Sequence, residues 1–116
     1  MEALCKIRDI YRTIAEFESQ FEKEFDLSLN EGMLLCSLID NKCLSSTEIA
    51  KNLGLTCSNT SKVIKSVENK KLIERTLGKE DKRQMYFTLT SEGEKMIKKI
   101  KTSPLDIPQN LKDIIR

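Results

Sequence analysis

The chain has 116 residues, of which 39% are hydrophobic and 33% charged, and its formal net charge is +2. This length suits a single domain, and no stretch approaches the ~20 apolar residues that cross a bilayer, so we expect a cytoplasmic protein without a membrane partner. The chain has no histidine and its four cysteines lack CxxC spacing, so we expect no metal site, no cofactor and no enzyme activity. In a reducing cytosol these cysteines are expected to be buried or half-buried packing groups.

Positive charge is concentrated in the middle of the chain. Residues 1–43 hold 5 basic and 9 acidic side chains, residues 44–101 hold 13 and 7, and residues 102–116 hold 2 of each. Such an asymmetry is typical of a polyanion-binding segment joined to a part with a different task.

The spacing of apolar residues predicts one long amphipathic helix at the start of the chain. They recur every three to four residues, at Ile7, Ile10, Tyr11, Ile14, Phe17, Phe21 and Phe25. With the apolar residues near the other end of the chain, this stripe supplies more apolar surface than a small lobe needs to cover itself. We therefore expect a homodimer. The alternative is that these side chains cap the core of one monomer.

Two capping boxes predict the next two helices. Ser28 and Glu31 precede a strongly apolar run, which should be central to the core, and Ser45 and Glu48 precede a shorter run that stops at Gly54. Glycine at that point suits a left-handed residue that ends the helix.

The next helix, capped by Thr56 and continuing to about Lys71, completes a helix-turn-helix pattern. At 100° per residue its inner side holds Thr60, Val63, Ile64 and Val67, and its outer side holds Ser58, Ser61, Lys62, Lys65 and Asn69. Small hydroxyl and amide groups at a helix N-terminus, followed by lysines, suit base edges between the phosphates of a major groove. The alternative is an ordinary helix start with a solubilising face.

A hairpin is predicted next, with strands over residues 73–77 and 84–89 around a charged tip. The cations Lys79, Lys82 and Arg83 are expected to extend the positive surface to the flanking minor groove. We interpret Asp81 as the partner that holds the arginine. The alternative is a solvated turn.

Two more helices are predicted after the hairpin. Thr90 is expected to cap one that continues through about Lys101, and Pro108, as a first helical residue, is expected to open a short last helix. Leu111, Ile114 and Ile115 form its apolar side.

Three motifs stand in order along the chain: LTCSNTSKVIKSVENKKLIER, the DKR of residues 81–83, and FTLTSEG. With them, residues 44–100 resemble the MarR family of winged-helix transcriptional regulators. The resemblance implies a mainly α (α+β) fold, in which a winged helix-turn-helix lobe at residues 28–101 is flanked by dimerisation helices at residues 1–27 and 102–116. It also implies a homodimeric repressor on a pseudo-palindromic operator in double-stranded DNA.

The resemblance further implies which side chains contact DNA. Base and phosphate contacts would lie at Thr56, Ser58, Asn59, Ser61 and Lys62, and a minor-groove contact would lie at Arg83 with Asp81 bracing it. Lys71 stands where members of the family usually have glycine.

Three further hypotheses remain open. A winged-helix scaffold can instead serve as a protein-interaction module. A small-molecule effector could bind near Tyr11, Phe17 and Met33, although such a set is more often plain core. A cysteine-based redox sensor could use Cys5, near the start of the first predicted helix, or Cys57, at a helix start on the proposed DNA face, where oxidation would add bulk or charge.

Overall fold

The computed structural model describes residues 2–78, 85–103 and 105–115. The chain divides into two compact units, Met1–Leu29 with Ser103–Arg116, and Asn30–Thr102. Within the described ranges, no helix has the length and apolar character needed to cross a membrane.

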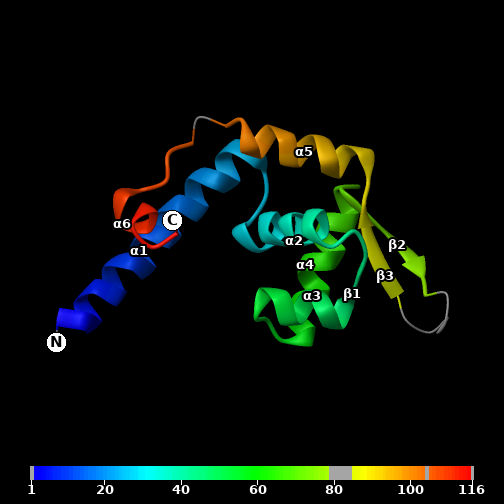
Figure 1. Cartoon of the computed structure of the whole chain (residues 1–116), viewed down its shortest axis with the longest axis horizontal. Helices are drawn as coiled ribbons and strands as arrows, with labels where there is room; N and C mark the ends of the chain where they lie inside the picture. Colours follow the sequence, from blue (N-terminus) through cyan, green and yellow to red (C-terminus); the bar gives the residue numbers. More distant parts are fainter. Residues whose placement is uncertain (1, 79–84, 104, 116) are drawn as a thin grey trace. The chain divides into compact units, whose positions relative to one another are not determined.

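The first unit is built on the long helix α1, Glu2–Phe25, with the short helix α6, Gln109–Lys112, beside it (Figure 1). The Asn110 side-chain amide donates to Thr13 Oγ1 over 3.0 Å and joins the two helices. α1 confirms the long helix predicted from the apolar spacing. The prediction for Pro108 is wrong by one residue, because it precedes α6 as its cap with an extended ψ of 148°.

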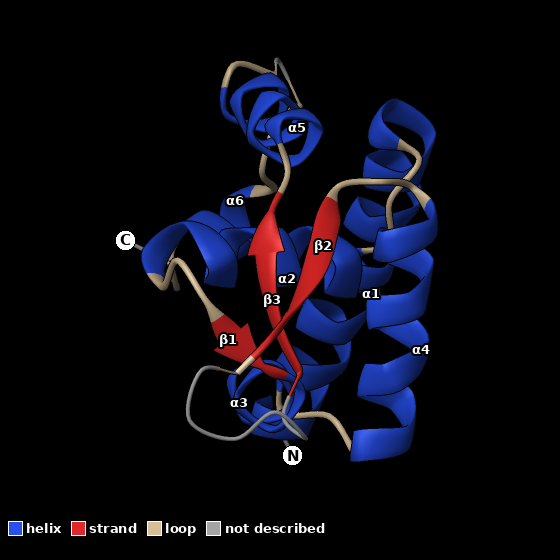
Figure 2. Ribbon diagram, turned by 90° about the vertical axis from the view of Figure 1, so that its right-hand side faces the viewer, coloured by secondary structure: helices blue, strands red, loops and turns tan. Residues whose placement is uncertain are grey.

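The described residues of the second unit form four helices and three strands, which are drawn in Figures 1 and 2. They are α2 Leu29–Asp40, β1 Leu44–Ser45, α3 Ser46–Leu53, α4 Cys57–Asn69, β2 Ile73–Leu77, β3 Met85–Leu89 and α5 Ser91–Lys101. The sheet has the order β1-β3-β2 with antiparallel pairs, and Figure 2 shows β3 between the other two strands. This arrangement confirms the predicted mainly α fold with a winged helix-turn-helix lobe; a dimerisation role for α1 and α6 stays a prediction.

The core of the second unit is centred on α2, as predicted. Leu34, Leu35 and Leu38 of this helix are fully or almost fully buried, and so are Ile49 of α3 and Val67 of α4. Burial of such side chains contributes roughly 1.5–3 kcal/mol each. α2 therefore fixes where the helix-turn-helix pair lies.

Two features of the lobe differ from the sequence-based expectation. β1, whose Leu44 pairs with Phe87, was not predicted, because a two-residue strand has no readable alternation. α4 ends at Asn69, two residues before the predicted end, because Lys71 takes a left-handed φ of 63°. The N–H groups of Lys71 and Leu72 then donate to the carbonyls of Glu68 and Val67 over 2.9 and 3.2 Å. These two bonds form a Schellman C-cap.

Candidate nucleic-acid interface

Both ends of α3 are specified by residues close to them in sequence. The Glu48 N–H donates to Ser45 Oγ over 3.2 Å, and the Ser45 N–H donates to Glu48 Oε1 over 3.0 Å, which confirms the predicted capping box. The hydrogen bonds from the Ser45 backbone and side chain lower the pKa of Glu48 from its ordinary value of 4.5. Gly54 ends α3 with a left-handed φ of 67°, as predicted.

The start of α4 is fixed by two threonines. Thr56 Oγ1 accepts the Asn59 N–H over 3.1 Å, and Thr60 Oγ1 donates to the Thr56 carbonyl over 2.7 Å. Thr60 is 1% exposed, so its side chain faces the core of the lobe and its hydroxyl is not available to DNA. Because Thr56 Oγ1 already accepts the cap hydrogen bond, any base or phosphate contact there would share this oxygen.

The outer side of α4 is exposed along its whole length. Ser58, Asn59, Ser61, Lys62, Lys65 and Asn69 are all exposed, whereas Thr60, Ile64 and Val67 are buried and Val63 is half-buried. The predicted division of the helix into two sides is therefore confirmed. Contact between this outer side and DNA stays a prediction.

The two strands of the predicted hairpin pair with each other. β2 and β3 are paired from Ile73 with Leu89 to Leu77 with Met85. Lys79, Asp81, Lys82 and Arg83 lie outside the described residues. Their predicted roles in a minor groove stay predictions.

The junction of β3 and α5 explains the LTSEG motif. Thr90 Oγ1 accepts the Gly93 N–H over 3.1 Å and donates to the Lys71 carbonyl over 2.7 Å. A Cβ at Gly93 would lie 2.1 Å from the Leu72 carbonyl oxygen. Thr90 and Gly93 thus hold the start of α5 against the end of α4, which confirms the predicted cap.

Two ion pairs at the end of α4 were missed by sequence reasoning. Glu31 of α2 contacts Lys70, and Arg75 of β2 contacts Glu68. Glu31 is 39 residues from its partner, so only the fold brings the two together. Arg75 reaches Glu68 because β2 begins at Ile73 and passes beside the end of α4.

The expectation of buried or half-buried cysteines is wrong. All four, Cys5, Cys36, Cys43 and Cys57, are exposed, because they lie on outward-facing helix surfaces or in the turn before β1. Although Cys36 is exposed as a residue, neighbouring atoms partly desolvate its thiol, which raises its pKa, and the charge of Asp40 raises it further. A raised pKa lowers the thiolate fraction and hence the reactivity of this thiol.

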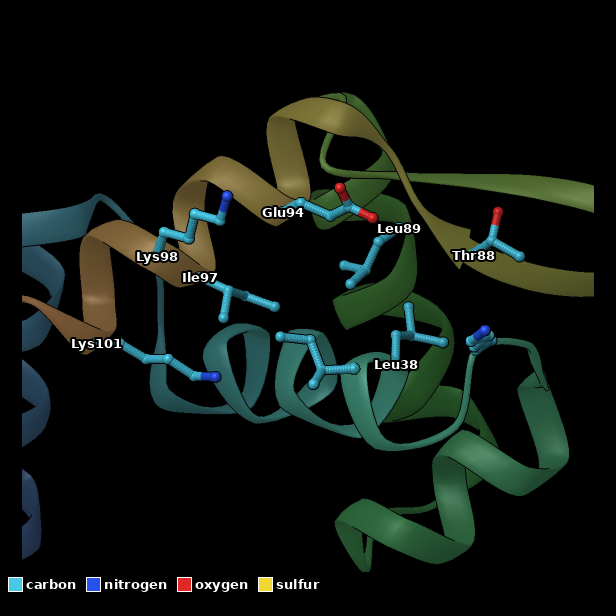
Figure 3. A pocket seen from close by; sticks show the side chains of 9 residues that line it. Leu38, Thr88, Leu89, Glu94, Ile97, Lys98 and Lys101 are labelled. Atoms are coloured by element: carbon cyan, nitrogen blue, oxygen red, sulfur yellow. The ribbon is translucent and has the colours of Figure 1, made fainter.

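A groove of about 530 Å³ lies between α2, β3 and α5 (Figure 3). Its apolar lining is Leu38, Ile39, Leu89 and Ile97, and its charged lining is Lys42, Glu94, Lys98 and Lys101. Figure 3 shows Lys101 directed toward α2. Tyr11, Phe17 and Met33, the residues expected near an effector, are not among those that line this groove.

The sequence model of the MarR family matches residues 27–85. The chain belongs to the MarR family. One relative, the HTH-type transcriptional regulator Hpr of a Geobacillus species, is 31% identical over 94 residues, which cover 81% of this chain and 47% of the relative. The chain spans about half the length of the curated relatives it matches.

Solved structures share the fold of this MarR-family chain. A mutant of S. aureus MepR bound to an oligodeoxyribonucleotide has a TM-score of 0.70 at 25% identity, over 88% of this chain and 75% of that one. A structure of Bordetella bronchiseptica BpsR, whose DNA binding is regulated by 6-hydroxynicotinic acid, has a TM-score of 0.67 at 20% identity, over 80% and 73%.

Proposed function

We propose that this MarR-family chain is a transcriptional regulator, not an enzyme, and that it acts as a homodimeric repressor on a pseudo-palindromic operator. The observation that carries the proposal is the exposed outer side of α4, where hydroxyl and amide groups precede two lysines. No acidic residue occurs in α4 before Glu68. Relatives named as HTH-type regulators, and the MepR mutant bound to an oligodeoxyribonucleotide, support the same class of partner.

In this proposal α4 lies in the major groove of double-stranded DNA. Ser58, Asn59 and Ser61, at its first turns, face base edges or phosphates, and Lys62 and Lys65 neutralise phosphates further along. Lys79, Lys82 and Arg83 reach the flanking minor groove, with Asp81 holding the arginine.

The first unit supplies the dimer contacts in this proposal. Leu4, Ile7, Tyr11 and Ile14 of α1 are all exposed, and Tyr11 is 78% exposed. An exposed apolar stripe of this kind is typical of an interface. A two-fold dimer would place two α4 helices about one duplex turn apart, ~34 Å, which would match a pseudo-palindrome.

Selection of bound duplexes from a random pool tests the proposal. We expect a symmetric site whose binding weakens steeply with salt, because lysines that neutralise phosphates release counterions. Lys62→Ala and Arg83→Ala should each weaken binding of that site and lower the salt slope by roughly one. Lys95→Ala, on α5, is the matched control and should change neither. Unchanged binding in both test variants would contradict the regulator proposal and favour a protein-interaction module.

The groove between α2, β3 and α5 is the place we assign to an effector. Its aliphatic floor and three lysines against one glutamate fit a small amphipathic anion. Benzoate should raise the melting temperature of the protein, whereas benzylamine, of similar shape and opposite charge, should not. Lys101→Glu should remove the benzoate response. Equal responses to both compounds would contradict this assignment.

The redox-sensing variant of the function rests on the exposure of Cys5 and Cys57. If it operates, mild peroxide should release wild-type protein from its operator, while Cys5→Ser or Cys57→Ser should stay bound. If peroxide released neither wild type nor the two variants from the operator, the redox-sensing alternative would be contradicted.

A further inference from the structure

One flank of the last turn of α4 is tied to α2. Ser66 Oγ donates to Glu31 Oε2 over 2.8 Å, and Lys70 Nζ lies 3.0 and 3.2 Å from the two carboxylate oxygens of Glu31. The Glu31 side chain is only 9% exposed. A buried carboxylate without a partner destabilises the folded state. Glu31 therefore favours the position of α4 in which Ser66 and Lys70 reach it.

The other flank is tied to the sheet. Arg75 of β2 donates from Nε to Glu68 Oε2 over 2.8 Å and from Nη2 to Oε1 over 2.6 Å. Its guanidinium also lies 5.6 Å from the ring centroid of Phe87, its partner in the strand register. The hydrogen bond and charge of Glu68 raise the pKa of Arg75. One side chain thus connects α4, β2 and β3.

These two contacts lie on opposite flanks of the helix. At 100° per residue, Ser66 and Lys70 are neighbours, and Glu68 lies about half a turn away from them. Ile64 and Val67 face inward between the flanks, and the outer side lies opposite them. Apolar packing is non-directional and resists rotation of a helix about its axis weakly, whereas directional hydrogen bonds on both flanks resist it in both senses.

A small rotation of α4 about its axis would displace the side chains that are proposed to contact bases in the major groove. A turn of about 20° moves a side-chain tip ~6 Å from the helix axis by about 2 Å. That displacement exceeds the tolerance of a hydrogen bond to a base edge.

We propose that Glu31, Glu68 and Arg75 are positioning residues that set the rotation of α4 about its own axis, and with it the aim of its outer side chains. This inference rests on the proposed function, DNA binding through α4. Arg75 also lies in the strand that leads to the hairpin tip, so the same contact fixes α4 relative to that strand. In this role Arg75 contacts Glu68 and not a phosphate.

The test compares Glu68→Gln and Arg75→Gln with wild type, on the selected duplex and on a scrambled one. Glu68→Gln removes a negative charge near DNA, which by itself would strengthen binding. Loss of the correct position of α4 would weaken binding instead. We expect both variants to bind the selected duplex about tenfold more weakly and the scrambled duplex within about twofold of wild type. The salt slope should stay unchanged. The exchanged pair, Glu68→Arg with Arg75→Glu, should recover most of the lost affinity.

Lys95→Gln, which removes one cation from an exposed pair on α5, is the matched control and should match wild type. The proposal is overturned if Glu68→Gln binds the selected duplex as well as or better than wild type. It is also overturned if Arg75→Gln lowers the salt slope by about 0.9, the value for one phosphate contact.

A readout without DNA separates this inference from the proposed function. If wild type selected no duplex, the proposed function would fail, and amide chemical shifts would still report the position of α4. Glu68→Gln should then shift amides across residues 57–65, beyond its own turn. Shifts confined to residues next to the substitution would overturn the positioning role, and melting curves would confirm that each variant is folded.

Discussion

At the residue scale, two glycines of the lobe, Gly54 after α3 and Gly93 in α5, serve different physical needs. Gly54 has a left-handed φ of 67° and open space where a Cβ would lie. Gly93 has an ordinary helical backbone, but a Cβ there would lie 2.1 Å from the Leu72 carbonyl oxygen. The first position therefore needs conformational freedom, and the second needs the absence of a side chain.

We expect Gly93→Ala to lower the free energy of unfolding by roughly 3 kcal/mol, because backbone must move to admit the methyl group. Gly54→Ala, the matched control, should cost only about 1 kcal/mol of left-handed strain. Denaturant unfolding of both variants measures the difference. Equal costs would contradict the close approach of α5 to Leu72.

Lys71 is a residue whose backbone conformation suits glycine. Its left-handed φ of 63° costs an L-residue roughly 1–2 kcal/mol, a strain that glycine would remove. Glycine would in turn cost about 0.5–1 kcal/mol, because its unfolded chain has more conformational freedom to lose. Lys71→Gly should therefore stabilise the protein by about 0.5 kcal/mol in denaturant unfolding. A clear loss of stability would show that the lysine side chain has a compensating contact.

At the element scale, α3 and α4 start with caps and end with left-handed residues, so both boundaries are local. The capping box of Ser45 and Glu48 has a titratable member, Glu48. Because hydrogen bonds lower the pKa of Glu48 in the folded state, its contribution to stability is present above its ordinary value of 4.5 and is lost as pH falls through the folded value.

We expect wild type to melt at a higher temperature than Glu48→Gln at about pH 6, and the difference to shrink as pH falls through the lowered pKa of Glu48. Glutamine keeps the capping geometry without the charge, so other acids titrate equally in both proteins. Thermal melts across this pH range measure the difference. A gap that did not change with pH would contradict the proposed contribution of the carboxylate.

At the scale of the whole molecule, the apolar surface is unevenly placed. Phe21 and Phe25 of α1 are buried with their ring centroids 4.9 Å apart, whereas Ile7 and Tyr11 of the same helix are exposed. The predicted apolar stripe therefore has two parts: its C-terminal part is buried, and its N-terminal part is exposed. The exposed part is the surface that the proposed dimer would use.

We expect Ile7→Asp to weaken self-association by about tenfold or more, because it places a charge in the proposed dimer interface. Leu77→Asp on β2 is the control, since Leu77 is 61% exposed and Ile7 is 58% exposed. Sedimentation equilibrium measures both. Equal dissociation constants for wild type and Ile7→Asp would contradict a dimer through this face.

Local sequence determined most of the helix boundaries and the two sides of α4, because caps, glycines and 3.6-residue periodicity act within a few residues. It could not determine β1, which exists only through its pairing with Phe87. It also missed the contacts of Glu31 with Lys70 and of Arg75 with Glu68, because the partners are brought together by α2 and β2. The exposure of the cysteines was likewise decided by tertiary packing, since a small apolar side chain fits either side of a helix until its neighbours are placed.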